Sequence, residues 1–181
     1  LATALEAHRI LTRTDEGKWT AGPALPGNRD RLLTAAGPIM DKLLEETGES
    51  VQLYELTGTT RTCIATREPE AGLHNVVPVG RQLPLTSGSA ARIIAAFTPT
   101  TVSGTTFGEA DIEAARSNGI SESVEEREAG LSSVSVPVLD PAGTFIAALS
   151  VSGSAERFRP SPAAKFGSPL KDAARKLGAL L

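Results

Sequence analysis

The fold is decided by residues 131–153, which read LSSVSVPVLDPAGTFIAALSVSG. Both halves of this stretch alternate apolar residues with small or polar ones, and a repeat of two residues is the period of a β-strand. The segment Asp140–Gly143 fits a type I turn, because proline presets one φ angle and glycine suits the last turn position. We therefore predict a hairpin of two strands, Leu131–Leu139 and Thr144–Ser152.

The two faces of this hairpin differ in chemistry. If the strands pair directly across a four-residue turn, Ser133 lies opposite Ser150, and Leu131 lies opposite Ser152. A solvent-facing surface favours charged residues and a core favours bulky ones, so a face of small hydroxyls is interpreted as a ligand-facing wall. The opposite face is apolar and belongs to the core: Val134, Val136, Val138, Phe145, Ala147 and Leu149.

A second wall of the same site is predicted at the start of a helix over Ser87–Phe97. The first backbone N–H groups of a helix lack intrahelical partners, so a helix start binds a carboxylate or phosphate well. Placed beside the serines of the hairpin, it predicts a site for a small anionic or polar molecule. An alternative stays open, in which Ser87 only caps the helix and the strand serines only fill a tight sheet.

The rest of the chain supplies further helices and strands. A Pro/Gly-rich break over Gly22–Asn28 marks a boundary, and Thr106 with Glu109 three residues later has the pattern of a capping box. Strands in hairpins with helices inserted and flanking predict an α+β fold around a mostly antiparallel sheet. The other expected elements are a helix end over 3–8, a short hairpin over 10–21, helices over 29–47, 106–118 and 161–180, and strands over 51–57, 61–66 and 73–77.

Composition bounds the class of protein. The chain has 181 residues, of which 40% are hydrophobic and 22% charged, as expected for a globular domain with a real core. A net charge of −3 argues against nucleic-acid binding through the overall field. The single cysteine, Cys63, cannot form an internal disulfide and favours a cytoplasmic location. No apolar run approaches the roughly 20 residues that span a bilayer, so no membrane association is expected.

Catalytic and metal chemistry find little support in the sequence. The only histidines are His8 and His74, and neither accompanies a recognisable nucleophile motif. Cys63 falls in the middle of a predicted strand and is best explained as a packed apolar residue. We therefore predict a protein that is not an enzyme and that has no metal site and no cofactor.

The same segments carry a family resemblance. They are Leu1–Leu11, Lys18–Leu25, Glu45–Val51, Val77–Gly80, Leu83–Thr86, Gly130–Val138 and Ala147–Gly153. In their order and spacing over essentially the whole chain, these segments resemble the isocitrate-lyase-regulator (IclR) family of bacterial transcription regulators.

The resemblance implies an architecture and a function. Residues 1–27 would be the remnant of a winged helix-turn-helix, residues 28–48 a linker helix, and residues 49–181 a GAF-like effector-binding domain. It implies a homodimer or tetramer that binds a small organic or aromatic acid and controls operator binding by rearranging the oligomer. A GAF-type sensor module that regulates another protein is the alternative, and the wing-like hairpin argues against it.

The resemblance also implies functional residues. The effector contacts of the family map onto Leu83, Ser89, Ala90, Leu131, Ser133, Ser150 and Ser152. Contacts of the wing with the DNA backbone map onto Arg9, Arg13 and Lys18, which would serve equally well as solvated surface residues. Because base reading needs helices that would precede Leu1, this chain alone is not expected to recognise an operator.

Three positions depart from the pattern of the family. Ser123 stands where some members carry an aspartate, Ser133 where a cysteine is frequent, and Arg9 where a glycine is usual. Glu126 and Glu128 lie near the missing acid and could partly replace it. The identity of the effector, and whether the protein represses or activates, do not follow from the sequence.

Overall fold

A six-stranded antiparallel sheet organises the computed structural model, which describes residues 2–14, 16–22, 26–70, 72 and 74–181. All neighbouring strands run antiparallel, which confirms the predicted α+β fold. In spatial order the strands are β5 (Gln82–Pro84), β4 (Thr60–Arg67), β3 (Ser50–Thr57), β8 (Phe145–Ser154), β7 (Leu131–Leu139) and β6 (Ser121–Val124).

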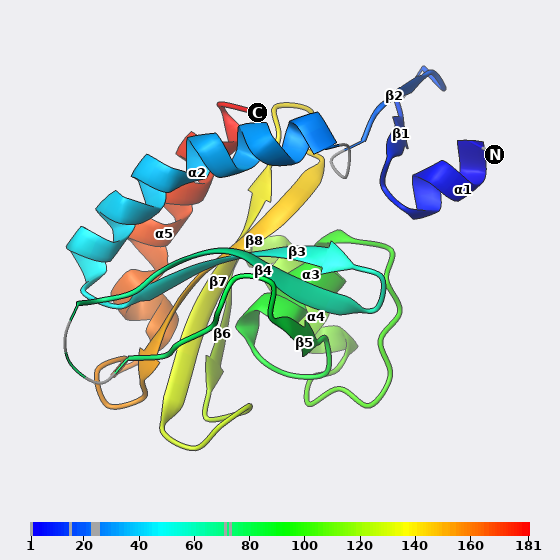
Figure 1. Ribbon diagram of the computed structural model, residues 1–181. Coiled ribbons are helices and arrows are strands. Elements are labelled where there is room, and N and C mark those ends of the chain that lie inside the picture. Colours follow the sequence, from blue (N-terminus) through cyan, green and yellow to red (C-terminus); the bar gives the residue numbers. More distant parts are fainter. Residues whose placement is uncertain (1, 15, 23–25, 71, 73) are drawn as a thin grey trace.

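One face of the sheet is covered by two long helices, α2 (Pro26–Thr47) and α5 (Pro162–Gly178), which lie side by side in Figure 1. Each presents an apolar stripe to the sheet, as the spacing predicts. The Ser161 hydroxyl accepts a hydrogen bond from the Ala164 N–H at 3.1 Å and so caps α5. Helix α2 is a single helix that contains Pro38 in its interior.

The other face carries two shorter helices, α3 (Ser89–Phe97) and α4 (Glu109–Asn118) (Figure 1). Helix α3 buries nearly all of its side chains against β7 and β8, because small and aliphatic residues surround its axis. A second apolar cluster fills this layer, with Tyr54, Cys63 and Phe145 among its members. The cavity described below lies on this face of the sheet.

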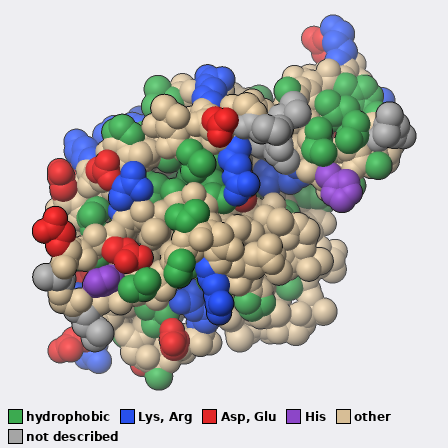
Figure 2. All heavy atoms as spheres, in the orientation of Figure 1, with side chains coloured by type: hydrophobic (Ala, Val, Ile, Leu, Met, Phe, Trp, Pro, Cys, Tyr) green, Lys and Arg blue, Asp and Glu red, His purple; other side chains and the backbone are tan. Residues whose placement is uncertain are grey.

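The N-terminal segment stands apart from this body. It consists of α1 (Ala2–Ala7) and the predicted hairpin of β1 (Leu11–Arg13) and β2 (Trp19–Ala21), and it projects from the molecule in Figures 1 and 2. Residue Asp15 in its turn and residues 23–25 of the predicted boundary lie outside the described residues, as does Leu1. No helix in the described part of the chain is long and apolar enough to cross a membrane.

The register of the β7–β8 hairpin differs from the predicted one by two residues. Ser133 lies opposite Ser152, and Ser135 lies opposite Ser150. The predicted pairs were wrong because the turn is longer by one residue and a bulge follows at Val138/Leu139. A shift of two keeps every serine on its predicted face, since side chains alternate with a period of two. Beyond the bulge, Phe145 joins the α3 side instead of the predicted core face.

Three local predictions also need correction. Residues 74–77 form no strand, because Gly80 and Arg81 take the hydrogen-bonding positions beside Cys63 on β4; Leu73 is outside the described residues. Helix α3 begins at Ser89, so Ser87 is not its cap. Helix α4 is capped at Gly108, whose N–H donates to Asp111 Oδ2 at 2.9 Å, and the predicted box of Thr106 with Glu109 does not form.

Candidate functional site

Four serine hydroxyls meet where α3 begins over β7 and β8. Ser89 Oγ lies 2.7 Å from both Ser133 Oγ and Ser135 Oγ, and Ser135 Oγ lies 2.5 Å from Ser150 Oγ. Ser150 also donates to the Val134 carbonyl at 3.3 Å. Alternation along the strands places these hydroxyls on one face, and only the packing of α3 adds the fourth.

A second polar chain continues the wall toward β3. Ser152 Oγ donates to Gln52 Oε1 at 2.9 Å and accepts from Asn75 Nδ2 at 2.9 Å. Gln52 is fully buried, and its Nε2 has no hydrogen-bond partner. An acceptor atom of a ligand in the adjoining cavity would give this buried amide N–H the hydrogen bond that it lacks.

A buried arginine borders the same region. Arg61 is 2% exposed, and its Nη1 donates to the carbonyls of Pro84 at 2.7 Å and Ser87 at 3.0 Å, whereas its Nε has no partner. Burial lowers the pKa of Arg61 to about 10, which leaves it charged at neutral pH. Its guanidinium lies 5.7 Å from the centroid of the Tyr54 ring.

These side chains line a small cavity of about 20 Å³, the serine cavity. That volume has room for about one water molecule, so a metabolite can enter only if the walls move apart. The lining residues are Gln52, Tyr54, Arg61, Asn75, Gly88, Ser89, Ala90, Ser123, Arg127, Leu131, Ser133, Ser150 and Ser152.

Larger cavities exist elsewhere, but their walls offer fewer buried polar groups that could bind a ligand specifically. The largest of those described, about 760 Å³, lies between the N-terminal segment and the turn that joins β3 to β4. Two others, of about 480 and 460 Å³, adjoin the tip of the β7–β8 hairpin. In the described part of the chain, none of these three is lined by a buried side-chain atom that lacks a hydrogen-bond partner. The small cavity therefore has the stronger chemical case as a binding site.

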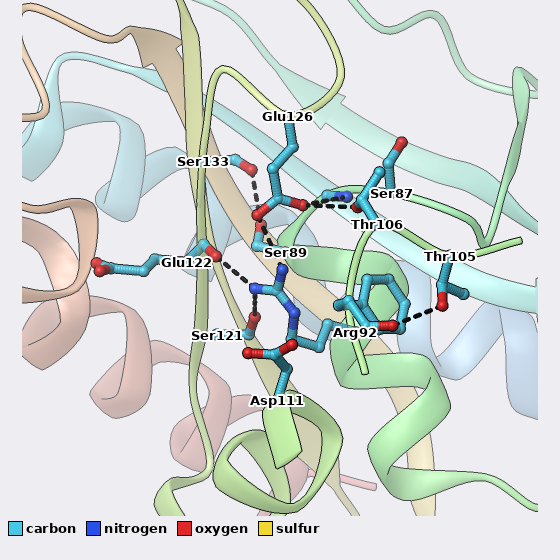
Figure 3. A network of polar contacts seen from close by, with 12 residues as sticks. Ser87, Ser89, Arg92, Thr105, Thr106, Asp111, Ser121, Glu122, Glu126 and Ser133 are labelled. Atoms are coloured by element: carbon cyan, nitrogen blue, oxygen red, sulfur yellow. Dashed lines mark hydrogen bonds and ion pairs between the residues drawn. The ribbon is translucent and has the colours of Figure 1, made fainter. Parts of the chain in front are cut away.

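An ion pair between Glu126 and Arg92 lies beside the start of α3, next to this cavity (Figure 3). Glu126 Oε1 accepts from Arg92 Nη2 at 2.8 Å, and its Oε2 accepts from the Gly88 N–H and the Thr106 hydroxyl, each at 3.2 Å. Arg92 also donates to Ser121 Oγ at 2.9 Å. The helix start that we expected to hold a ligand anion thus already has a carboxylate of the protein at Gly88.

Six of the seven predicted effector residues line this one cavity: Ser89, Ala90, Leu131, Ser133, Ser150 and Ser152. Leu83 pairs with Arg61 across β4 and β5 and is not among the lining residues. Ser123, one of the departures from the family, is buried and lines the cavity. Glu126 does not line it, because its carboxylate is turned toward Arg92.

Besides Ser123 and Gly88, five further lining residues were not predicted: Gln52, Tyr54, Arg61, Asn75 and Arg127. Alternation along residues 51–57 puts Gln52 and Tyr54 on one face, so an amide between the apolar Val51 and Leu53 was an available signal. Asn75 and Arg127 come from segments between strands, and no periodic pattern assigns those to a face.

The three basic residues predicted for DNA contact have different surroundings. Arg13 and Lys18 are exposed on the hairpin, where Lys18 pairs with Glu16 at 2.8 Å. Arg9 is half-buried and donates from Nη2 to the Phe145 carbonyl at 2.5 Å. Its guanidinium therefore faces the body of the molecule.

The family model described as "Bacterial transcriptional regulator IclR C-terminal" matches residues 28–114 and 94–179. These matches span most of the chain and cover the sheet, its four helices and the serine cavity. The chain belongs to the IclR family.

Curated relatives agree with this assignment. The chain is 28% identical over 183 aligned positions to proteins named HTH-type transcriptional repressor AllR from Klebsiella pneumoniae and Escherichia coli K12. In both comparisons the match covers 91% of this chain and 67% of the relative.

Solved structures of IclR-family proteins have the same fold. An IclR-family regulator from Rhodococcus matches 99% of this chain and 78% of its own, with a TM-score of 0.72 at 27% identity. The C-terminal domain of the E. coli regulator KdgR matches 83% of this chain and 98% of its own, with a TM-score of 0.68 at 27% identity. Thermotoga maritima IclR has a TM-score of 0.72 at 22% identity, which shows the shared fold.

Membership of the IclR family makes this chain part of a transcriptional regulator rather than an enzyme, as the sequence predicted. The antiparallel sheet with flanking helices is the fold of the effector-binding domain of this family. Among the described residues, no group of three or more His, Cys, Asp or Glu side chains is placed to hold a metal ion.

Proposed function

We propose that this IclR-family chain senses a small acidic metabolite at the serine cavity and thereby controls operator binding. The observation that carries the proposal is the convergence of Ser89, Ser133, Ser150 and Ser152 in one small cavity, beside buried donors of Gln52 and Arg61 that have no partner. Hydroxyls and buried N–H groups without partners are suited to a ligand that offers oxygen acceptors. The proposal therefore names an organic or aromatic acid as the effector.

The wider mechanism divides the chain into three parts. Residues 1–27 would belong to the DNA-binding side, residues 28–48 would form the linker helix, and residues 49–181 would bind the effector. Ligand binding would change how sensor domains pair in a dimer or tetramer, by as much as the ligand prefers one arrangement. The similarity to AllR repressors supports repression as the mode of control, in a cytoplasmic protein.

Exposed basic residues of the hairpin fit the DNA-binding side of this proposal. Arg13 and Lys18 would contact phosphates of operator DNA, which positions a protein without reading sequence. Arg9 would instead serve the contact between the N-terminal segment and the body, because its guanidinium faces Phe145.

The test is a thermal-shift screen of this chain against small carboxylates and aromatic acids, followed by calorimetry on the best ligand. Ser150→Ala and Ser152→Ala should each weaken binding about tenfold, because a lost hydrogen bond to a charged group costs about 1.5 kcal/mol or more. Ser132→Ala is the matched control: its buried hydroxyl on β7 has no partner and does not line the cavity. Unchanged affinity in both cavity variants would discard the assignment of the site.

A further inference from the structure

The charges around the serine cavity are unbalanced. Two of its lining residues, Arg61 and Arg127, are cationic, and none of the described lining residues is acidic. A buried charge without a partner costs several kcal/mol, so folded proteins normally pair it. The cavity thus has two positive groups and no negative one to balance them.

Arg61 is held in place by the protein without being neutralised. Both of its hydrogen bonds come from Nη1 and go to backbone carbonyls, which carry no net charge. Its Nε is buried without a partner, and its Nη2 would lie 3.5 Å from a Cβ built on Gly88. The free donors of the guanidinium therefore lie beside the start of α3, on the border of the cavity.

Arg127 approaches the same cavity from the segment between β6 and β7. It lies close enough to Tyr54 to counteract part of the rise in the pKa of that phenol, whereas the Arg61 guanidinium lies over the tyrosine ring. The two guanidinium groups are close enough for Arg127 to lower the pKa of Arg61. The neighbouring carboxylate of Glu126 is already bound to Arg92, Gly88 and Thr106.

We propose that the ligand of this cavity is a small dicarboxylate whose two charges are balanced by Arg61 and Arg127. Because the Arg61 guanidinium, from β4, lies over the Tyr54 ring and Arg127 enters the lining from the separate segment between β6 and β7, two carboxylates match them better than a single compact anion. The unpartnered Gln52 Nε2 supplies a further donor. This inference rests on the proposed function and narrows its ligand from acids in general to diacids.

Calorimetry on the 181-residue chain tests the charge requirement. The probes are malonate, succinate and glutarate, each beside its monoamide, which keeps the length and removes one charge. At least one dicarboxylate should bind ten or more times tighter than its monoamide. Arg61→Gln and Arg127→Gln should each abolish that preference, and Arg61→Lys should keep part of it because the charge remains.

A folding measurement and a control variant separate loss of binding from loss of the fold. Thermal unfolding of each variant shows whether it folds; Arg127 is only partly buried, so Arg127→Gln carries the test if Arg61→Gln does not fold. Arg81→Gln, an exposed arginine outside the cavity lining, is the control and should bind like the parent chain.

Several outcomes would overturn the inference. Equal affinity for a diacid and its monoamide, no binding by any diacid, or tighter binding of inorganic phosphate than of every diacid would each do so. Binding of a monoacid that Ser150→Ala weakens would then leave the proposed function standing. If Ser150→Ala also left the affinity unchanged, both the diacid inference and the proposed function would be refuted.

Discussion

Gln52 and Arg61 are almost inaccessible to solvent, yet each has a nitrogen without a hydrogen-bond partner. Leaving a buried donor unsatisfied costs about 1–3 kcal/mol. Both residues line one cavity on one face of the sheet, so a ligand in that cavity could offset this cost.

Tyr54 gives a spectroscopic signal from the same place. Burial raises the pKa of its phenol to about 12, from an ordinary value of 10.0, and the chain has no other tyrosine. We predict that tyrosinate absorbance of the folded chain rises with a midpoint near 12. In urea the midpoint should fall near 10, because unfolding exposes the ring.

The same shift makes stability depend on pH. As the pH rises, the unfolded state loses its phenolic proton before the folded state does. The contribution of Tyr54 to the free energy of unfolding is therefore complete below pH 10 and is lost as the pH rises to about 12. Tyr54→Phe removes the group and should flatten that part of the profile. A folded-state midpoint near 10 would contradict the buried position of the ring.

At the scale of elements, the end of α5 packs directly on the end of β7. A Cβ built on Gly178 would lie 2.0 Å from the Leu139 carbonyl oxygen, a backbone atom that cannot turn aside. Glycine at this position lets the helix reach the hairpin beside its bulge at Val138/Leu139. The contact therefore ties the last helix to the strand that carries Ser133 and Ser135.

Gly178→Ala should destabilise the chain by about 2 kcal/mol, because helix and strand must separate to admit the methyl group. Gly27→Ala is the matched control at the start of α2, where nothing lies within 4 Å of a Cβ. That control should be neutral or more stable by about 0.5 kcal/mol, since alanine loses less chain entropy than glycine on folding. Urea unfolding of the two variants measures the difference, and equal stabilities would refute the close packing.

At the scale of the molecule, Arg9 connects the N-terminal segment to the body. Its φ of 57° is left-handed, which costs a non-glycine residue about 1 kcal/mol. Its guanidinium donates to the Phe145 carbonyl and lies 5.7 Å from the centroid of that ring. The resemblance to the IclR family implies a glycine at this position, and a glycine could make neither of these side-chain contacts.

Arg9→Gly should free the segment without unfolding the body. The variant keeps the backbone conformation, since glycine tolerates positive φ, but loses both contacts with Phe145. Amide hydrogen exchange over residues 2–22 should speed up severalfold, with the thermal midpoint of the body unchanged. Arg13→Ala is the control, because Arg13 donates to the Gly17 carbonyl and lies over the Trp19 ring, both within the hairpin. Unchanged exchange in Arg9→Gly would show that other contacts hold the segment.

Much of this architecture follows from periodicity in the chain. Alternation in residues 131–153 determined which side chains face the core, and helical spacing determined α2 and α5, because both patterns are local properties of the backbone. The predicted serine face was therefore right even though every predicted serine pair in it was wrong. A shift of two residues preserves the face and changes the partner.

Tertiary structure alone decided the site itself. Asn75 and Arg127 reach the cavity from segments without periodicity, and Glu126 reaches the start of α3 across 38 positions of sequence. Such contacts depend on how whole elements pack, which no local pattern encodes. The sequence by itself determined the sheet, its two faces and the serines that line one of them. Packing determined that those serines lie beside two arginines without a counter-charge, and that is the feature from which the ligand was inferred.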